Sequence, residues 1–400
     1  MRNIPFSPPD ITEKEIEAVA EVMRSGWITT GPKTKEFERR LTDYCGSAGT
    51  ACLNSATAAL ECTMRVLGIG KGDEVITSAY TYTASAAAAL HVGATVRLCD
   101  TARSSFFMDY DKLRDMITPK TKAIIAVDIG GTMCDYDRIF EIVNEKSALF
   151  TPNNELQSGF GRCIVIADGA HSLGATYHNM PSGSVADFTC FSFHAVKNLT
   201  TAEGGAAMWR AQPFIDNDEI YKKYMLCSLH GQSKDALAKT KAGAWEYDIV
   251  EPLYKCNMTD IMAAIGTVQL DRYEQMMQKR KKLCEIYDNI LADSKFIKPI
   301  FETVDFQSSR HLYLLRIEGF TPNQRNLLIE KAAENGVSTN VHYKPLPMMT
   351  AYKKLGFDIT DYPNAYAQFA NEISLPLNTK MSEDDASYAS ETIARICKNI

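Results

Sequence analysis

The chain has 400 residues, enough for two or three domains and a large apolar core. Apolar residues make up 45% and charged residues 23%, proportions that exclude a disordered, collagen-like or disulfide-scaffold protein. Lys and Arg number 43 against 49 Asp and Glu, and the net charge of −6 disfavours binding to nucleic acid or to an anionic membrane. A local basic pocket for a phosphorylated ligand is still compatible with this charge.

Cysteine usage and the absence of apolar segments indicate a cytoplasmic protein. The 11 cysteines are scattered from Cys45 to Cys397, with no CxxC pair and no Cys/His cluster of zinc-site spacing. We therefore expect reduced thiols and no metal. The N-terminal residues MRNIPFSPPD lack the apolar region of a signal peptide, and the apolar run from Ala84 to Leu90 is too short to cross a membrane.

The first elements are an extended segment and two helices. Prolines keep residues 1–10 extended, and Thr12-x-x-Glu15 is a capping box that opens a helix ending at Gly26. A second helix is predicted from Thr34 to Tyr44.

From residue 50 onward, short Val/Ile-rich runs alternate with helical patterns. This alternation predicts βαβ units around a mainly parallel sheet. Strands are expected at 51–54, 74–79, 94–100, 123–129, 163–168, 189–193 and 204–209, and helices at 56–67, 83–91, 109–116 and from 137. The polar segment from Ser147 to Arg162 is expected to be an inserted loop.

After about residue 270 the pattern changes to a smaller α/β domain. A long charged helix is predicted from Leu270 to Leu291, followed by a strand at 311–319, a helix from Asn323 to Glu334 and a last helix after Ser382. The expected organisation is an N-terminal segment and helix (1–30), a large domain (31–269) and a small C-terminal domain (270–400).

The segment from Asn54 to Thr57 joins a predicted strand to a predicted helix. Its small and hydroxyl-bearing residues Ser55, Ala56 and Thr57 would let a phosphate approach the free N–H groups at the helix start. Taken alone, such a segment is more often an ordinary helix cap.

Asp168 ends the predicted strand 163–168, where ligands bind in open α/β sheets. A carboxylate there could hold a protonated ring nitrogen, and it could also be a cap or turn residue. His171 follows in the same loop.

Lys197 follows an apolar strand and precedes a glycine-containing segment, with Ser192 and His194 close in sequence. A lysine in a desolvated site has a lowered pKa and becomes a nucleophile, although most lysines are solvated surface charges. The phosphate cradle, the acid and the lysine together are the protein groups that pyridoxal 5'-phosphate (PLP) needs.

The chain also resembles the DegT/DnrJ/EryC1/StrS family of PLP-dependent sugar aminotransferases over nearly its whole length. The resemblance lies in SGWITTGPKTKEFE (25–38), NSATAAL (54–60), GKGDEVIT (70–77), TPKTKAIIAV (118–127), ADGAHSLGA (167–175), SFHAVKNLTTAEGG (192–205), YKCNMTDIMAA (254–264) and VHYKPL (341–346). It implies the α/β fold of aspartate aminotransferase, PLP fold type I. Within the family, the sequence blocks are most similar to those of nucleotide-sugar 4-aminotransferases that act on UDP sugars.

The resemblance implies a role for each matching residue. Lys197 would bind the cofactor covalently and shuttle the proton, Asp168 would hold the pyridine nitrogen, and His171 would face the 3-oxygen. The cofactor-binding set would be Ser55, Ala56, Thr57, Tyr82 (stacked on the ring), Ser192, His194, His230 and Asn257, of which His230 and Asn257 would reach the neighbouring subunit's site. The nucleotide sugar would contact Phe6, Trp27, Ile28, Thr29, His342 and Tyr343.

The same resemblance implies a homodimer with shared active sites, L-glutamate as amino donor and a nucleotide-linked 4-keto-6-deoxy sugar as acceptor in glycan biosynthesis. A 3-keto-sugar aminotransferase on another carrier, such as dTDP, and a non-catalytic regulator on the same fold stay open as alternatives. Related dehydratases carry histidine in place of the lysine, so Lys197 disfavours that class.

Overall fold

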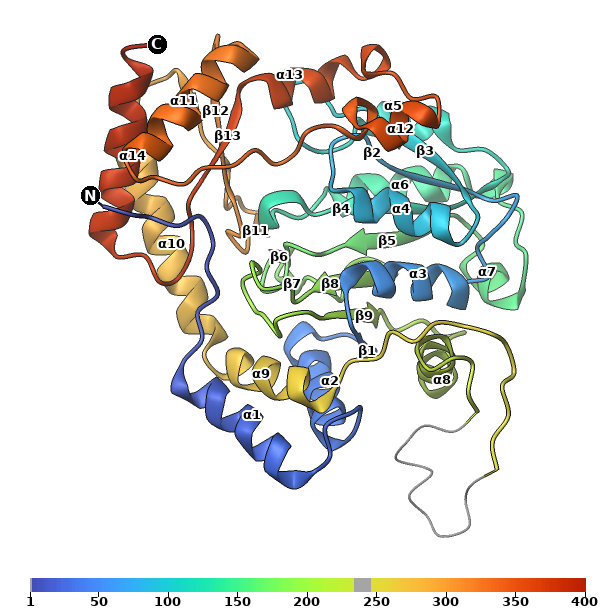
Figure 1. Ribbon diagram of the computed structural model, residues 1–400. Helices are drawn as coiled ribbons and strands as arrows, with labels where there is room; N and C mark the ends of the chain where they lie inside the picture. The colour runs from blue at the N-terminus through green and yellow to red at the C-terminus, as the bar shows by residue number, and fades with distance from the viewer. Residues whose placement is uncertain (1, 234–245) are drawn as a thin grey trace.

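A seven-stranded sheet forms the centre of the larger part of the molecule (Figure 1). The structure is a computed structural model that describes residues 2–233 and 246–400. The strand order is β1-β9-β8-β5-β4-β2-β3. The strands are β1 (Gly49–Leu53), β2 (Glu74–Ser78), β3 (Thr95–Cys99), β4 (Thr121–Val127), β5 (Ile164–Asp168), β8 (Phe188–Ser192) and β9 (Gly205–Trp209).

The sheet is mainly parallel, which confirms the predicted fold class. Strands β3, β2, β4, β5 and β8 pair in parallel, and β9 runs antiparallel to both β8 and β1. The carboxyl ends of β4, β5 and β8 consequently lie at one edge of the sheet, here called the carboxyl edge, where ligands bind in such folds.

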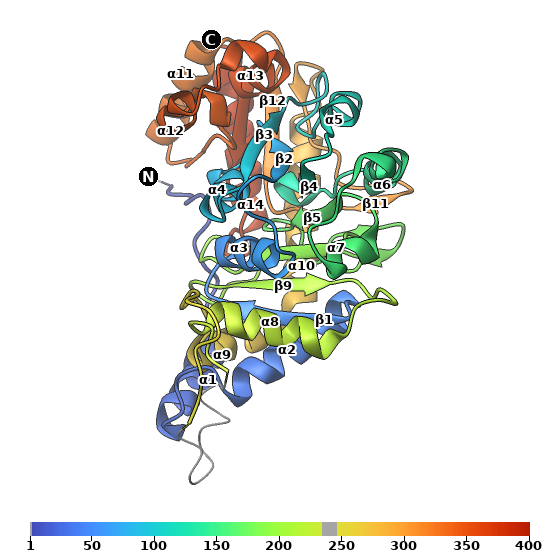
Figure 2. The same ribbon diagram turned by 90° about the vertical axis from the view of Figure 1, so that its right-hand side faces the viewer.

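Helices cover both faces of this sheet (Figure 2). Alternate residues of β4 serve the two faces, since Ile125 packs with Leu60 while Ile124 packs with Ile139. One face carries α3 (Ala56–Val66), α4 (Thr83–His91) and α8 (Asn217–Ser228). The other carries α2 (Pro32–Cys45), α5 (Tyr110–Met116), α6 (Tyr136–Glu145) and α9 (Asp260–Asp271).

Local signals in the sequence set the ends of several helices. The Thr12 capping box opens α1 (Glu13–Ser25), and Gly26 ends it at φ 76°, a left-handed conformation that glycine adopts without strain. The expected loop from Ser147 to Arg162 is wrong in one respect, because it contains helix α7 (Glu155–Phe160) capped by Asn154. Gln157 of this helix is buried and donates to the carbonyl of Leu67 at 2.8 Å, a contact that a short polar segment does not reveal.

A smaller sheet of three antiparallel strands holds the second core. It contains β10 (Phe296–Ile297), β12 (Tyr313–Ile317) and β13 (Glu372–Leu375), packed against α10 (Tyr273–Ile290), α11 (Pro322–Glu334) and α14 (Glu383–Cys397). Ile4 packs into this core, so the two ends of the chain lie in the same part of the molecule (Figure 1). A boundary at residue 270 therefore stays a proposal, with residues 1–30 contacting both parts.

The remaining elements are short. They are β6 (Thr176–Tyr177), β7 (Met180–Pro181), β11 (Phe306–Gln307), α12 (Thr350–Lys354), α13 (Pro363–Asn371) and the 3-10 helices η1 (Ile129–Gly131), η2 (Ser147–Leu149), η4 (Leu346–Met348) and η5 (Ile359–Asp361). The predicted helix from Leu270 is interrupted at Arg272, where α9 ends and α10 begins.

Among the described residues, no helix has the length and apolar character that crossing a membrane requires. All 11 cysteines are buried and free.

Helix α2 receives its N-terminal cap from a distant residue. Its own N-cap position is Gly31, which has no side chain to offer. Buried Asp260 instead accepts hydrogen bonds from the backbone N–H groups of Gly31 (2.7 Å), Lys33 (3.1 Å) and Thr34 (3.0 Å). One carboxylate thus satisfies the open end of α2 and fixes it to the start of α9.

We predict that Asp260→Ala destabilises the protein by at least about 2 kcal/mol, because it leaves several buried N–H groups without an acceptor. Asp271→Ala is the matched control, since Asp271 is exposed and its ion pair with Arg40 contributes at most about 1 kcal/mol. Urea unfolding of both variants measures the difference, and equal losses would contradict the capping role.

Candidate active site

The predicted acid and lysine meet at the carboxyl edge of the large sheet. Asp168 is the last residue of β5 and is 6% exposed. Lys197 lies in the turn after the adjacent strand β8, where its N–H donates to the carbonyl of His194 at 2.9 Å. The charges of Asp168 and Lys197 act on each other's pKa values. The strand order therefore brings together two groups that are 29 positions apart in the sequence.

The Asp168 carboxylate is held by two hydrogen bonds. The hydroxyl of Ser85, on α4, donates to Oδ2 at 2.6 Å, and the backbone N–H of Ala170 donates to Oδ1 at 3.2 Å. Burial raises the pKa of Asp168, whereas these two bonds and the charge of Lys197 oppose that rise. The result is a fixed carboxylate in a low-dielectric site, suited to holding a protonated ring nitrogen.

Burial makes the Lys197 amine a nucleophile near neutral pH. It lowers the pKa of Lys197 to about 8, and the negative charge of Asp168 limits the fall. A substantial fraction of the amine is then unprotonated at physiological pH, which covalent catalysis by lysine requires.

His171 is a neutral hydrogen-bond donor. Its Nδ1 accepts from the backbone N–H of Gly130 at 3.1 Å, which leaves the proton on Nε2, 3.2 Å from the hydroxyl of Tyr343. Burial holds the pKa of His171 well below its usual value. The ring of His311 lies 4.4 Å away, and its Nδ1 lies 2.9 Å from Oδ1 of Asn198.

The start of α3 forms a cradle for an anion. Ser55 is its N-cap and accepts from the N–H of Ala58 at 3.1 Å, while the remaining first-turn N–H groups have no acceptor within the helix. Ser192 pairs with Gly205 across β8 and β9. A Cβ at Gly205 would lie 2.5 Å from the backbone N of Ala56, so glycine is required for this close approach. Ser192 is thereby placed beside the helix dipole, an arrangement that binds phosphate.

Aromatic residues from separate segments line the same site. Tyr82, the N-cap of α4, is 60% exposed, and its ring lies 5.9 Å from that of Tyr343. Phe6 stacks on His342 at 5.5 Å, and His342 Nδ1 lies 2.8 Å from the Ser374 hydroxyl. Burial lowers the pKa of His342 to about 4, so this side chain is also neutral. The four residues Phe6, Tyr82, His342 and Tyr343, all predicted from the sequence, therefore lie together in the structure.

The other predicted residues form a second group near the start of α3. Asn257 bridges to Leu53 through its backbone and donates to the Thr30 hydroxyl at 2.6 Å, and the indole N–H of Trp27 donates to the Thr30 carbonyl at 3.2 Å. The same region contains Ala56 and Thr57 with exposed Ile28 and Thr29.

Two predicted histidines are exposed in this chain. His194 is exposed, with Nε2 3.6 Å from a carboxylate oxygen of Glu203, and His230 is exposed at φ 62°. Their contact with the cofactor stays a prediction.

Sequence reasoning missed Ser85, Gly130 and His311. Ser85 is a polar residue on the buried side of the alanine-rich helix α4, a signal that the sequence does contain. Gly130 and His311 act through tertiary contacts that no local pattern indicates.

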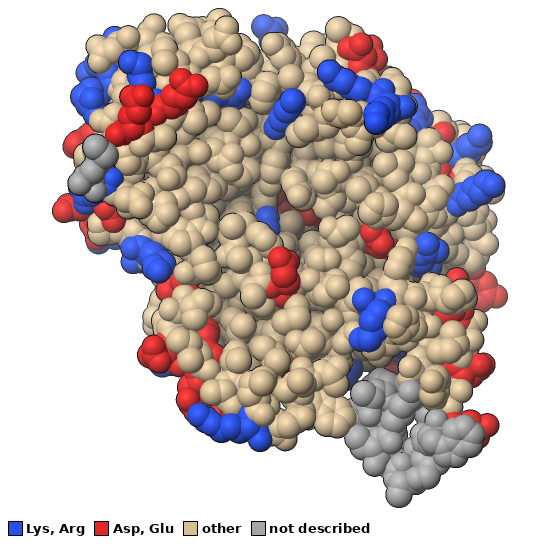
Figure 3. Space-filling model, viewed as in Figure 1, with Lys and Arg blue, Asp and Glu red and all other residues tan. Residues whose placement is uncertain are grey.

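The molecular surface agrees with a small buried site. Figure 3 shows a hollow near the centre of this face, in which small positive and negative areas are visible between uncharged atoms, while other charges are scattered around the rim. No group of three or more potential metal ligands occurs among residues 2–233 and 246–400.

The combined arrangement fits PLP. The anion cradle suits its phosphate, the Asp168 carboxylate its ring nitrogen, and the Lys197 amine its aldehyde. Gly205 supports this fit, because β9 can come this close to the start of α3 only where the residue has no Cβ.

Comparisons with known proteins agree with this geometry. The protein Spr1654 from Streptococcus pneumoniae, named as a sugar aminotransferase and solved in a PMP form, is 56% identical, with a TM-score of 0.97 and coverage of 99% of this chain and 100% of its own. Its PLP form gives 55% identity and a TM-score of 0.96, with 99% of each chain covered. PseC from Helicobacter pylori, an aminotransferase involved in the biosynthesis of pseudoaminic acid, is 25% identical, with a TM-score of 0.87 and 100% of both chains covered.

A curated relative is the spore coat polysaccharide biosynthesis protein SpsC of Bacillus subtilis. It is 34% identical over 401 aligned positions, covering 99% of this chain and 97% of SpsC. The model of the DegT/DnrJ/EryC1/StrS aminotransferase family matches residues 9–394. The chain is therefore a PLP-dependent transaminase, and it belongs to the DegT/DnrJ/EryC1/StrS aminotransferase family.

Proposed function

We propose that the protein transfers an amino group from L-glutamate to the C4 keto group of a nucleotide-linked 6-deoxy sugar, with UDP as the carrier, in surface glycan biosynthesis. The observation that carries the chemistry is the pairing of half-buried Lys197, whose amine is desolvated, with buried Asp168 at the carboxyl edge. A sugar as the amino acceptor is supported by the names of Spr1654, PseC and SpsC, each of which aligns along nearly all of this chain.

Each residue of the site has a distinct task in this reaction. When bound, PLP stores the electrons released as a proton leaves the amino-bearing carbon. Lys197 would hold the cofactor covalently, and its amine, once released, would take the proton from the donor carbon and deliver a proton to the sugar carbon. Asp168 would keep the ring nitrogen protonated, and the hydrogen bond from Ser85 fixes the orientation of the Asp168 carboxylate for that contact.

The remaining residues position the reactants. The α3 N-terminus with Ser192 anchors the cofactor phosphate, and neutral His171 donates from Nε2 into the site. Phe6, His342 and Tyr343 form an aromatic wall beside Tyr82, which suits a sugar face and a flat base. Trp27, Ile28 and Thr29 extend the substrate contacts in this proposal.

The working form in this proposal is a homodimer with shared active sites. Apolar side chains face outward on α1 and just beyond it, with Ile16 53%, Met23 55% and Ile28 46% exposed. A second copy covering this face would bury them. His230 and Asn257 are the residues we expect to reach the neighbouring site, and light scattering should give twice the 44.5 kDa chain mass.

We predict that Lys197→Ala and Lys197→Arg abolish transamination. The loss should exceed the roughly 10²- to 10⁴-fold supplied by a positioned acid–base group, because the covalent attachment is lost as well. Single-turnover assays with L-glutamate measure it, and normal turnover by either variant would refute the assignment.

Asp168→Asn should lower kcat by at least roughly 10²-fold, the scale of a single preorganised electrostatic contact. The amide cannot stabilise the protonated ring nitrogen as a carboxylate does. Cofactor content, measured by absorbance, separates this effect from loss of binding. Turnover near the wild-type level with full cofactor content would argue against the role.

PLP attachment to the cofactor-free protein should accelerate with rising pH, with a midpoint near the Lys197 pKa of about 8. Below this pH the amine is protonated and cannot attack, and above it the amine is free. The control is the amino acid lysine with its α-amino group blocked, whose reaction with PLP should have its pH midpoint at about 10.4. Identical midpoints in stopped-flow absorbance would show that burial does not activate Lys197.

A two-step absorbance titration tests the substrate. L-glutamate is added to the holoenzyme, and the absorbance of the lysine-bound cofactor should fall. After the excess is removed, a UDP-4-keto-6-deoxy-HexNAc should restore it. If the absorbance falls but does not return, the 4-keto UDP sugar is not the substrate. If a 3-keto or dTDP-linked sugar restores the absorbance instead, that sugar takes its place in the proposal. No response to L-glutamate would overturn the proposed donor.

A further inference from the structure

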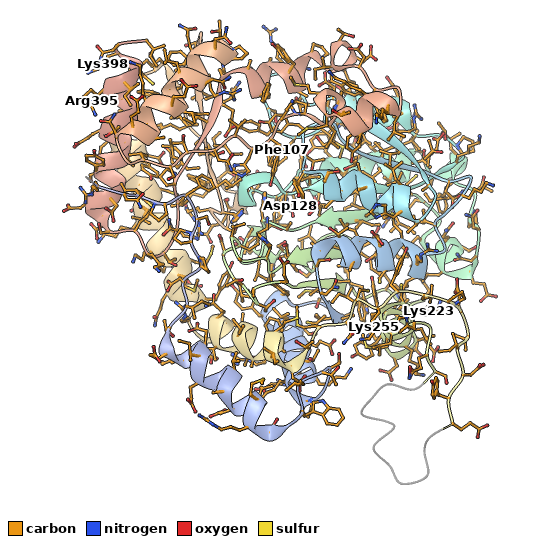
Figure 4. The ribbon with its side chains drawn as sticks, in the orientation of Figure 1. Phe107, Asp128, Lys223, Lys255, Arg395 and Lys398 are labelled. Carbon is orange, nitrogen blue, oxygen red and sulfur yellow. The ribbon has the colours of Figure 1, made fainter. Side chains whose placement is uncertain are left out.

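A cavity of about 580 Å³ lies between the two parts of the molecule, separate from the site described above. We call it the β12 cavity. Its walls are the segment after β3, η1 with the residues that follow it, the segment from 297 to 306, and one face of β12. Phe107, on the first of these walls, and Asp128, which precedes η1, are both labelled in Figure 4, where they lie between the large sheet and the smaller one.

Strand β12 presents an arginine to this cavity. Along the strand, Tyr313, Leu315 and Ile317 pack into the core of the smaller part, so the alternate residues Leu314 and Arg316 face the β12 cavity. Arg316 is only 9% exposed. Its guanidinium carbon lies 5.9 Å from the centroid of the Phe106 ring, a cation–π contact.

No described residue accepts a hydrogen bond from the Arg316 side chain or pairs with its charge. Glu372 lies opposite it in the β12–β13 register, but its carboxylate accepts from the His342 N–H at 2.9 Å and from the Ser374 hydroxyl. Burial lowers the pKa of Arg316, since its charge is desolvated without a counter-ion, and the nearby Tyr80 hydroxyl opposes the fall. A buried arginine without a partner is rare, because desolvation of the ion is unfavourable.

The other charged residues of the β12 cavity already have partners. Asp135 accepts from the Arg138 N–H and the Tyr177 hydroxyl, each at 3.0 Å. An Asp305 carboxylate oxygen lies 3.6 Å from Nδ1 of His178, and the Lys298 amine donates to the Asp288 carbonyl at 3.0 Å. Among the charged side chains that line this cavity, Arg316 is therefore the one that has no hydrogen-bond or ion-pair partner in the described part of the chain.

The rest of the lining is strongly aromatic. Phe106, Phe107, Tyr110, Phe301 and Phe306 contribute to it, and the volume lies within the range of small-molecule sites. The two acids on the walls disfavour a dianion such as a phosphate monoester, and the single free guanidinium matches one carboxylate through paired N–H groups.

We propose that the β12 cavity is a binding site for a small amphipathic monocarboxylate, whose carboxylate pairs with Arg316 and whose aromatic or branched apolar body packs among these rings. The site is separate from the catalytic one but shares a wall with it. Gly130 lines the cavity, and its N–H is the donor to His171 Nδ1.

The probe is 4-fluorophenylacetate, added to the wild-type holoenzyme and followed by fluorine NMR. Its neutral analogue 4-fluorophenylacetamide should bind at least tenfold more weakly. Arg316→Met should reduce the affinity for the carboxylate at least tenfold and make the two probes equal. Lys298→Met is the matched control, because the Lys298 amine is already bonded, and it should change the affinity less than twofold.

Methyl NMR of the methionines locates the bound probe. Met108 and Met133 line the β12 cavity, and their methyl signals should shift on addition of the carboxylate to wild type but not to Arg316→Met. Equal binding of the acid and the amide by wild type would overturn the proposal even if the variant failed to fold. Binding that leaves both methionine signals unchanged, or no binding at millimolar concentration, would also overturn it.

Discussion

The site depends on one electrostatic balance, the burial of Lys197 next to Asp168. Desolvation disfavours both charges, lowering the pKa of the lysine and raising that of the acid, while their attraction opposes both shifts. Neither group could be moved to the surface without losing its function, because solvent would restore its ordinary pKa. The sheet must therefore end two adjacent strands at one buried edge, and the helices on both faces keep water away from it.

Around this pair the chain uses backbone groups wherever an orientation has to be fixed. The N–H of Gly130 selects the tautomer of His171, the N–H of Ala170 helps to hold Asp168, and the first turn of α3 offers N–H groups to an anion. Backbone donors belong to packed elements and lose little entropy when a ligand binds, so that the site is preorganised. The proposed substrate contacts, in contrast, come from side chains of the N-terminal segment and of residues 342–343, which the smaller part of the molecule holds in place.

The interface between the two parts has two sides. One side carries the aromatic wall of the proposed sugar site, and the other encloses the β12 cavity with Arg316. The short helix η1 separates them and contacts both, through Gly130. Gly130 is thus a direct structural link between the two proposed ligand sites.

The sequence by itself determined the alternating α/β pattern, the capping box at Thr12, the segment before α3 and the Asp168–Lys197 pair, because each depends on residues adjacent in the chain or on a motif at the end of a strand. It also indicated the aromatic residues Tyr82, His342 and Tyr343. Only the tertiary structure decided which hydrogen bonds and ring contacts orient these site residues.

Asp260 caps α2 across 226 to 229 positions, Ser85 reaches Asp168 across 83, and Arg316 faces an aromatic cavity formed by three distant segments. Helix α7, which lies in the segment expected to be a loop, also depends on a distant contact, since buried Gln157 donates to the carbonyl of Leu67, 90 positions earlier. Such contacts join groups of high sequence separation, and the physical reason they escape sequence reasoning is that their energy comes from partners that only folding brings within hydrogen-bond distance.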